Sequence, residues 1–273
     1  MTIKINSERP MILGGPELKR RLVLRRIGAL AGLTAFGGTS ALLSGCGGGG
    51  GGTSTPLAAP PSLGAHALAW GSAGVGVDPT TVALDTLTSS GSTILVCVGR
   101  GHIDQHVPPT DNRGNTYALL EGPHNYPPLW MISGTALYAS SPASGGVNEI
   151  SASNNLNQDE ITVAVVEILN GGVIESRSWR YADQAGPFQT SDPVTTTGPA
   201  TLVAFWWGDA NVDLHTAVPR DGFTVIDSVF IRESIVQCAV AVKNVSAGEH
   251  TVTWDATPDQ GAQLYLVAVQ SAN

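Results

Sequence analysis

Three polar side chains alternate along the segment GHIDQHVPPTD, which follows an apolar run. His102, Asp104 and His106 stand two residues apart, so an extended backbone would place all three on one face. Histidine nitrogens and carboxylate oxygens are common Zn²⁺ ligands, and His124 could complete such a set. The spacing therefore predicts a candidate metal site at these residues. The alternative is a polar loop that holds no ligand.

The segment GDANVDLHTAVP repeats part of this pattern later in the chain. Asp213 and His215 have the spacing of the aspartate and second histidine in the first segment, and they also follow an apolar run. This echo fits either a shared loop architecture or a pair of sites. The chain has no HExxH motif and no cluster of cysteine ligands. We treat the two loops, around residues 102–115 and 208–222, as a candidate ligand rim.

Two adjacent tryptophans, Trp206 and Trp207, lie in the apolar run ATLVAFWWG. Successive side chains of a strand point to opposite faces, so the two rings cannot enter the same core. Either the strand is covered on both faces, which is the favoured interpretation, or one ring lines a groove of the candidate ligand rim and stacks on a sugar. Tyr126 is expected to be the exposed residue of the loop HNYPPLW. Core or inter-sheet positions are expected for Trp130, Trp179 and Trp254.

Signals for catalysis are sparse in this chain. It has neither a GxSxG nor an SxxK motif, so nucleophilic catalysis by serine has no motif to support it. A pair of carboxylates could support glycoside hydrolysis, and the alternative function is therefore an exported hydrolase acting on carbohydrate. The candidate acids are Glu121, Glu149, Glu167, Asp227 and Glu233. Among them, Glu167 is better explained as capping the end of a strand. No cofactor is predicted.

The N-terminal region differs in composition from the rest of the chain. A basic cluster at 19–26 precedes an uncharged segment from Ile27 to Gly45, and Cys46 follows. Basic, apolar and small-residue regions in this order are typical of a secretory signal. The apolar segment is short and rich in Gly and Ala, whereas a membrane span needs about 20 strongly apolar residues. Residues 1–45 are therefore predicted to be a signal peptide.

Two motifs in this region resemble known export signals. LSGC, which ends at Cys46, resembles the lipobox of bacterial lipoproteins, and KRRLVLR resembles the twin-arginine export signal through Arg20 and Arg21. The lipobox resemblance implies that Cys46 becomes the mature N-terminus and carries a diacylglycerol thioether and further acyl chains such as palmitate. It also implies a location in the bacterial cell envelope, periplasmic or surface-facing, and in the outer membrane if the cell is Gram-negative.

The residues after the cysteine are predicted to be a tether. Gly47 to Gly52 and the following TSTPLAAPPS favour neither helix nor strand, so they behave as a flexible chain that its prolines stiffen. We expect residues 46–63 to join the lipid anchor to a folded domain at 64–273. The membrane is then a partner of this chain through the lipid.

The charge balance excludes one class of partner. Residues 47–273 hold 7 basic and 20 acidic side chains, which gives a formal net charge of −13. Phosphates and anionic headgroups would be repelled by such a surface, so nucleic-acid binding is excluded. Cys97 and Cys238 lie in apolar runs in a chain expected to be exported. A disulfide between them and two buried free thiols both remain open.

The domain is predicted to be all-β. Short runs such as STILVCVG and ITVAVVEIL, rich in Val, Ile, Thr and aromatics, alternate with Gly, Pro, Asn and Asp clusters, which favours a β-sandwich or jelly roll. Segments from Pro142 and from Asn244 align at an offset of 102, and ILVCVGRG aligns with TLVAFWWG at an offset of 107. We therefore expect an internal duplication, with halves of about 64–190 and 191–273 that share one core.

The domain also resembles a β-sandwich found in uncharacterised exported bacterial and phage-related proteins. The shared motifs are a Gly-rich turn before NTY (Gly114 to Tyr117), a strand ending in VE (Val166 and Glu167), and AGxHTVT (Ala247 to Thr253). That resemblance implies a fold and no activity. Together these observations predict a lipid-anchored, non-catalytic β-sandwich that binds a protein or glycan ligand or has a structural role. The alternatives are the hydrolase and a metal-binding module that uses the His102 loop.

Overall fold

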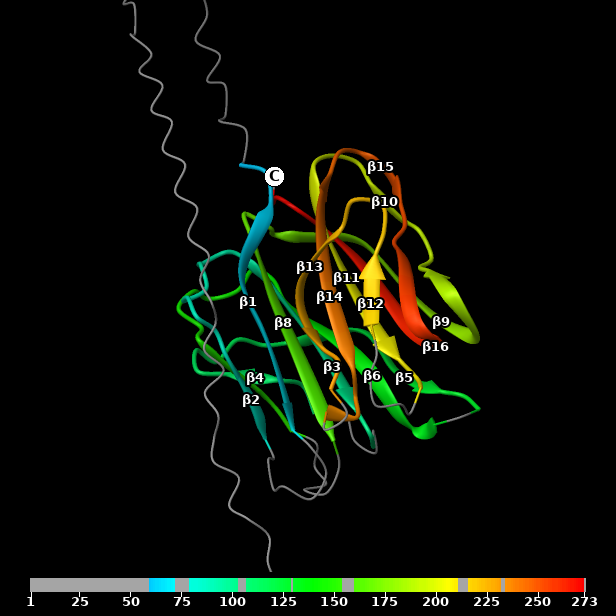
Figure 1. The fold of residues 1–273 in the computed structure, drawn as a ribbon. Coiled ribbons are helices and arrows are strands. Elements are labelled where there is room, and N and C mark those ends of the chain that lie inside the picture. Colours follow the sequence, from blue (N-terminus) through cyan, green and yellow to red (C-terminus); the bar gives the residue numbers. More distant parts are fainter. Residues whose placement is uncertain are drawn as a thin grey trace, which may run out of the picture. The chain divides into compact units, whose positions relative to one another are not determined.

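The computed structural model of this protein describes residues 59–71, 79–102, 107–128, 130–153, 160–210, 216–231 and 234–272, apart from the side chains of residues 184 and 185 (Figure 1). All of them belong to one compact unit, Ser54–Asn273. These residues form β-strands joined by turns and contain no α-helix. Within them, no helix is long and apolar enough to cross a membrane. The predicted all-β sandwich is confirmed.

Sixteen strands are formed by the described residues. The first eight are β1 (Ser62–Gly71), β2 (Thr80–Ala83), β3 (Thr93–Arg100), β4 (Thr110–Asp111), β5 (Ala118–Tyr126), β6 (Trp130–Ser140), β7 (Glu149–Ala152) and β8 (Ile161–Leu169). The second eight are β9 (Val173–Thr190), β10 (Val194–Thr196), β11 (Ala200–Gly208), β12 (Thr216–Pro219), β13 (Thr224–Val229), β14 (Cys238–Val245), β15 (Gly248–His250) and β16 (Thr253–Gln270).

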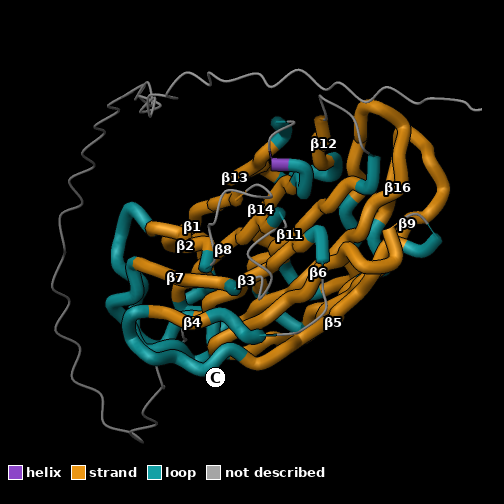
Figure 2. Tube along the Cα trace, turned by 90° about the horizontal axis from the view of Figure 1, so that it is seen from below, coloured by secondary structure: helices purple, strands orange, loops and turns teal. Residues whose placement is uncertain are grey.

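Two large antiparallel sheets form the body of the domain. One has the order β1-β8-β3-β6-β5, and these strands follow one another in this order in Figure 2. The other has the order β12-β16-β11-β14-β13, with β9 also paired to β16. The central strands β3 and β11 are buried along almost their whole length. Strands that read as continuous apolar runs are therefore the ones covered on both faces.

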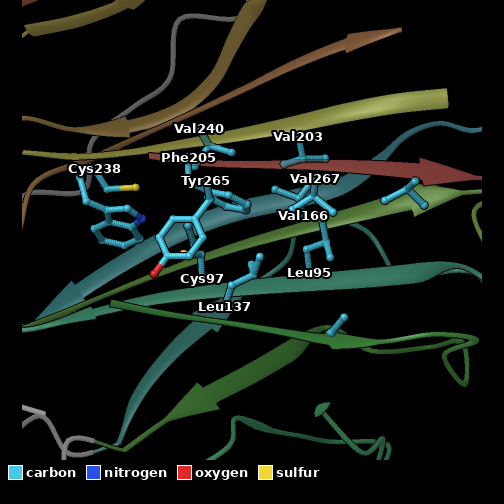
Figure 3. Close-up of a cluster of buried hydrophobic side chains, with 14 of the residues drawn as sticks. Leu95, Cys97, Leu137, Val166, Val203, Phe205, Cys238, Val240, Tyr265 and Val267 are labelled. Atoms are coloured by element: carbon cyan, nitrogen blue, oxygen red, sulfur yellow. The ribbon is translucent and has the colours of Figure 1, made fainter. Parts of the chain in front are cut away.

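A shared core lies between the two large sheets. Leu95, Cys97 and Leu137 of the first sheet face Phe205 and Tyr265 of the second, and Figure 3 shows these side chains pointing toward one another. All five are buried. Because neither sheet could cover this apolar face alone, the two halves stabilise each other through one core, as the sequence predicted.

The outer face of each large sheet has a smaller cover. Val82 on β2 and Ile150 on β7 pack on the first sheet, in a three-stranded sheet of order β2-β7-β4. Val194 on β10 and Ala217 on β12 belong to the corresponding cluster of the second sheet, where β10 pairs with β15. The domain is thus built in layers, with a small cover on each side of the central sandwich.

The order of the strands repeats between the two halves. The strand order β1-β8-β3-β6-β5 of the first large sheet corresponds to the order β9-β16-β11-β14-β13 of the second. The repeat divides the described residues at the turn of residues 170–172, upstream of the boundary near 190 that we expected. The reason is that β9 pairs with β16 just as β1 pairs with β8, so all of β9 belongs to the second half.

For the two central strands, the alignment of the two halves in the structure differs by one residue from the alignment that we made from the sequence. An offset of 107 matches Val98 with Phe205, but Val98 faces the outer cluster of its sheet, whereas Phe205 faces the shared core. An offset of 108 matches Cys97 with Phe205, and both lie in the shared core. The paired neighbours of these two residues, Ala164 and Tyr265, also face that core. A shift of one residue reverses every side chain of a strand, which the apolar runs alone could not reveal.

The first and the last described residues lie at the same end of the sandwich. Ser62 of β1 pairs with Leu169 of β8, and Thr93 of β3 pairs with the neighbouring Ile168. The hydroxyl of Ser271 donates a hydrogen bond of 2.7 Å to the carbonyl oxygen of Ala59. Figure 1 shows the C-terminus beside the start of β1. We call this the Ser62 end of the domain.

Asp111 organises the turn before NTY. Its carboxylate accepts hydrogen bonds from the backbone N–H groups of Arg113 and Asn115, from the Asn115 side chain and from the Tyr117 hydroxyl. Burial by itself raises the pKa of Asp111, but the hydrogen bonds together outweigh burial and lower the pKa below its usual value.

Protonation of Asp111 should therefore weaken the fold at low pH. A carboxyl whose pKa is lowered in the folded state stabilises the fold above the unfolded pKa of about 3.9, and this contribution is lost as the pH falls through the folded pKa. We expect Asp111→Asn to cost about 1–2 kcal/mol at pH 7 and to flatten the loss of stability below pH 4. Urea unfolding at several pH values measures this. Equal pH profiles for variant and wild type would contradict the prediction.

Candidate functional site

A pocket of about 230 Å³ lies between the ends of β3 and β11. We call it the strand-end pocket. The residues that line it include equivalent positions of the two halves, which are Arg100 and Gly208, Gly101 and Asp209, and Ser133 and Val236. The duplication therefore brings the same strand ends together around one cavity. Because the side chains at these positions differ, the cavity has different chemistry on its two sides.

Asp209 is the most constrained polar residue of this pocket. It is buried, and its Oδ2 accepts a hydrogen bond of 2.7 Å from the hydroxyl of Tyr181. Its backbone N–H donates to the carbonyl oxygen of Gly261, and its own carbonyl oxygen accepts from the indole Nε1 of Trp130 at 2.9 Å. A Cβ at Gly261 would lie 2.3 Å from the Asp209 Oδ2, so only glycine leaves room for the carboxylate.

Two tyrosines stand next to this carboxylate. The rings of Tyr126 and Tyr181 meet edge to face, with their centroids 5.7 Å apart. Burial, followed by the charge of Asp209, raises the pKa of Tyr126 well above its usual value. Burial and the hydrogen bond to Asp209 also raise the pKa of Tyr181. Both phenols therefore keep their protons at neutral pH and can donate hydrogen bonds.

The phenol of Tyr126 belongs to the lining of the pocket. The residue is only 5% exposed. No hydrogen bond among the described residues uses its hydroxyl, and this hydroxyl is not one of their buried polar atoms without a partner. The hydroxyl oxygen therefore keeps some access to the pocket, where a ligand or water can be its partner.

The pocket also holds charges of both signs. Arg100 is buried, and its Nε and Nη2 donate to the carbonyl oxygen of Ser153 at 3.1 and 2.8 Å. Glu160 lines the pocket together with Asp209. The lining therefore includes one cationic residue, whose guanidinium is bonded to the backbone, and two carboxylates.

Exposed apolar residues border the pocket. Trp130, which is 42% exposed, starts β6 and is followed by Met131 and Ile132, which are also exposed. Ile231 and Ile235 are exposed in the segment before β14. Trp130 and Ile235 belong to the pocket lining itself. Exposed apolar side chains that surround a concave polar site are typical of binding surfaces.

The structure describes only part of the predicted metal site. The Nδ1 of His102 is buried and has no hydrogen-bond partner among the described residues. Asp104, His106, Asp213 and His215 lie outside those residues. Within the described part of the chain, no three His, Cys, Asp or Glu side chains lie close enough to hold a metal ion. The metal site therefore stays a prediction.

His124 has other neighbours. Its Nε2 lies 3.0 Å from the Oε1 of Glu121, and its ring stacks on Trp179 with a centroid distance of 3.5 Å. The contact with Glu121 lies within β5, and the stacking on Trp179 joins β5 to β9, so that edge strands of the two large sheets touch. His124 is thus placed as a residue that closes one side of the sandwich.

The assignment of Trp206 and Trp207 to a ligand rim was wrong. Both are fully buried, Trp207 in the shared core and Trp206 in the outer cluster of the second large sheet. The Nε1 of Trp206 donates to the Oε1 of Gln189 at 2.7 Å. The favoured interpretation of core packing is confirmed, because β11 is covered on both faces. Trp254 is also buried, as expected.

Our expectation of which aromatic residue of the segment HNYPPLW is exposed was wrong. Tyr126 is buried and Trp130 is exposed, whereas we expected the opposite. Tyr126 is the last residue of β5, and its ring lies in the shared core. Trp130 starts β6 beyond that core, so nothing in the sandwich covers its ring fully. The exposed aromatic residue of this segment is therefore Trp130.

The carboxylates of the pocket are not the ones that the sequence suggested. Asp227 binds the Nδ1 of His66 at 2.7 Å and joins the edge strands β13 and β1. Glu167 is buried and accepts hydrogen bonds from backbone N–H groups, which agrees with our interpretation of this residue as a cap. Glu121 and Glu149 lie on β5 and β7, outside the pocket lining, and Glu233 lies outside the described residues.

Sequence analysis did not single out Arg100, Tyr181, Glu160 or Asp209, which form this site or support it. Some signal was present. Asp209 lies in the predicted ligand rim of residues 208–222, directly after the aligned run TLVAFWWG, and Arg100 lies near the end of the aligned run ILVCVGRG. Tyr181 and Glu160 carry no such signal, because only the fold brings them to this end.

Cys97 and Cys238 are both free thiols in the structure, and both are buried in the shared core. Burial raises the pKa of each thiol well above its usual value, so neither is a reactive thiolate at neutral pH. Comparisons of this chain with models of protein families, with curated proteins and with solved structures find no match.

Proposed function

We propose that this protein is a lipid-anchored component of the bacterial cell envelope that binds a ligand at the strand-end pocket. Cys46 is the anchor, and the tether ends before Ser62, two residues earlier than we expected, because Ser62 and Leu63 already pair with β8. The observation that carries the proposal is the position of the pocket, which lies at the end of the domain opposite to the Ser62 end. A tethered domain would thus offer its pocket to partners away from the membrane.

The direction of the strands supports this geometry. β3 runs from Thr93, near the Ser62 end, to Arg100 in the pocket. Its eight residues span about 25 Å at about 3.3 Å per residue. β11 runs in the same direction and reaches the pocket at Gly208. The pocket and the start of the domain are therefore separated by the length of the sandwich.

The anchor has its own test. Cys46→Ala should abolish labelling of the protein by a clickable palmitate analogue and release it from the membrane fraction, because no thiol remains at position 46 for the thioether. A single myristoyl-length chain binds membranes only marginally, so stable attachment requires the two or three acyl chains of a lipoprotein. Cys97→Ala is the matched control and should leave labelling unchanged. Persistent labelling of Cys46→Ala would refute the anchor.

Ligand binding is tested by photo-crosslinking in intact cells. A photoreactive phenylalanine replaces Ile235 at the pocket or Leu87, an equally apolar and exposed residue of the loop before β3. We expect adducts from position 235 and few from position 87. Equal adducts at both positions, or none at position 235, would contradict a binding role for the pocket.

A carbohydrate-active hydrolase is the second candidate. It is favoured by Glu160 and Asp209, because two carboxylates in one pocket can divide the roles of acid and base. Release of a chromophore from aryl glycosides tests it. Turnover that Glu160→Gln abolishes, with an unchanged unfolding midpoint, would establish the hydrolase in place of the binding protein.

A further inference from the structure

The chemistry of the strand-end pocket narrows the class of ligand, and this inference rests on the proposed binding role of the pocket. Its volume of about 230 Å³ is below the roughly 300–1,000 Å³ of sites for drug-sized molecules. It therefore has room for one ring and not for an extended chain. A longer molecule could enter only with its terminal unit.

The walls of the pocket suit a ring that has both apolar faces and polar edges. Trp130 and Tyr126 supply aromatic surface, and Ile235 extends it. The apolar C–H face of a sugar ring packs on such surfaces, as amphipathic ligands do on tryptophan and tyrosine. Trp130 is held in place by the hydrogen bond from its Nε1 to Asp209, so its ring is already oriented before a ligand arrives.

The polar groups of the pocket suit hydroxyl groups. The Tyr126 hydroxyl forms no hydrogen bond with the described residues and can donate to a ligand oxygen in the pocket. The Ser133 hydroxyl donates to the carbonyl oxygen of Gly101 at 2.6 Å, which leaves its oxygen free to accept. Glu160 and Asp209 accept from hydroxyl donors. A polyhydroxyl ring offers both donors and acceptors, which this set requires.

The charges of the pocket disfavour ionised ligands. An anion would meet two carboxylates and a domain of strongly negative net charge. A cation would lie close to the buried positive charge of Arg100, a residue of the pocket lining whose guanidinium is turned toward the carbonyl oxygen of Ser153. We propose that the strand-end pocket binds one neutral sugar ring, the terminal unit of a glycan, with Trp130 as the stacking residue and Tyr126 as the hydrogen-bond donor.

Saturation-transfer NMR on the purified full-length protein, in a detergent without a sugar headgroup, tests this proposal. The probes are glucose, galactose, mannose and N-acetylglucosamine, with glucosamine as the cationic and glucuronate as the anionic analogue, each at up to about 10 mM. We expect transfer to at least one neutral sugar and weaker transfer to both ionised analogues. Trp130→Ala and Tyr126→Phe should each weaken binding by about tenfold.

The matched control is Trp70→Ala, because Trp70 is exposed on β1 and lies outside the pocket lining. This variant should bind like the wild type. Binding that survives both Trp130→Ala and Tyr126→Phe, preference for glucosamine or glucuronate, or no transfer to any neutral sugar would each overturn the proposal. If adducts at position 235 persist while no sugar binds, the sugar is wrong and the binding role stands. If those adducts are also absent, the binding role itself fails.

Discussion

Replacement of Gly99 by alanine is expected to lower the free energy of unfolding by about 2–3 kcal/mol, because the shared core has no room for one more methyl group. A Cβ at Gly99 would lie 2.6 Å from the Cζ3 of Trp207 and from the Cγ1 of Val236. Trp207 is fully buried. Its ring cannot move away without disturbing neighbours packed at close to crystal density.

The position of Gly99 in the duplication explains this contact. Gly99 and Trp207 are equivalent residues of β3 and β11 at the offset of 108. One half of the duplication therefore has the smallest side chain where the other half has the largest, and the two meet across the shared core. A symmetric pair of tryptophans would not fit into this space, and a pair of glycines would leave a cavity.

Urea unfolding of Gly99→Ala measures the effect, and Gly186→Ala is the control. Gly186 lies in β9, and a Cβ added there would meet no atom of the described residues within 4 Å apart from its chain neighbours. Its substitution should change stability by less than about 0.5 kcal/mol. A Gly99→Ala protein as stable as Gly186→Ala would show that the core around Trp207 is looser than the structure indicates.

Glu167→Ala is expected to cost about 3 kcal/mol, because it removes the acceptor of two backbone donors. Oε2 of Glu167 accepts from the N–H of Ala65 at 2.9 Å, and Oε1 accepts from the N–H of Ser89 at 2.6 Å. Each donor left without a partner costs about 1–3 kcal/mol when buried. Gly64 permits this arrangement, since a Cβ there would lie 2.5 Å from Oε2.

Thermal and urea unfolding of Glu167→Ala check this expectation, with Glu249→Ala as the matched control. Glu249 is an exposed residue of β15, so its loss should change stability by less than about 0.5 kcal/mol. Glu167→Gln keeps one acceptor oxygen and should lose less than Glu167→Ala. Equal stability of Glu167→Ala and Glu249→Ala would mean that water replaces the carboxylate without cost.

Much of the fold was predictable from local patterns. Val, Ile and aromatic runs bounded by Gly, Pro and Asn favour strands wherever they occur, so the all-β class follows from the chain itself. The duplication was visible because ILVCVGRG and TLVAFWWG are both central strands with apolar residues on both faces. For the same reason their alignment slipped by one residue, since a run that is apolar on both faces carries no alternation to set the register.

The sequence by itself determined the strands, the repeat and the composition of the segment from Arg20 to Gly52, because these depend on residue types and spacing along the chain. Only the tertiary structure decided which aromatic residue is exposed and which carboxylates share a pocket. Tyr126, Glu160 and Asp209 are far apart in sequence and meet because two equivalent strands end side by side. Such proximity depends on sheet order and on which face each side chain takes, and both are set by long-range packing that no local pattern encodes.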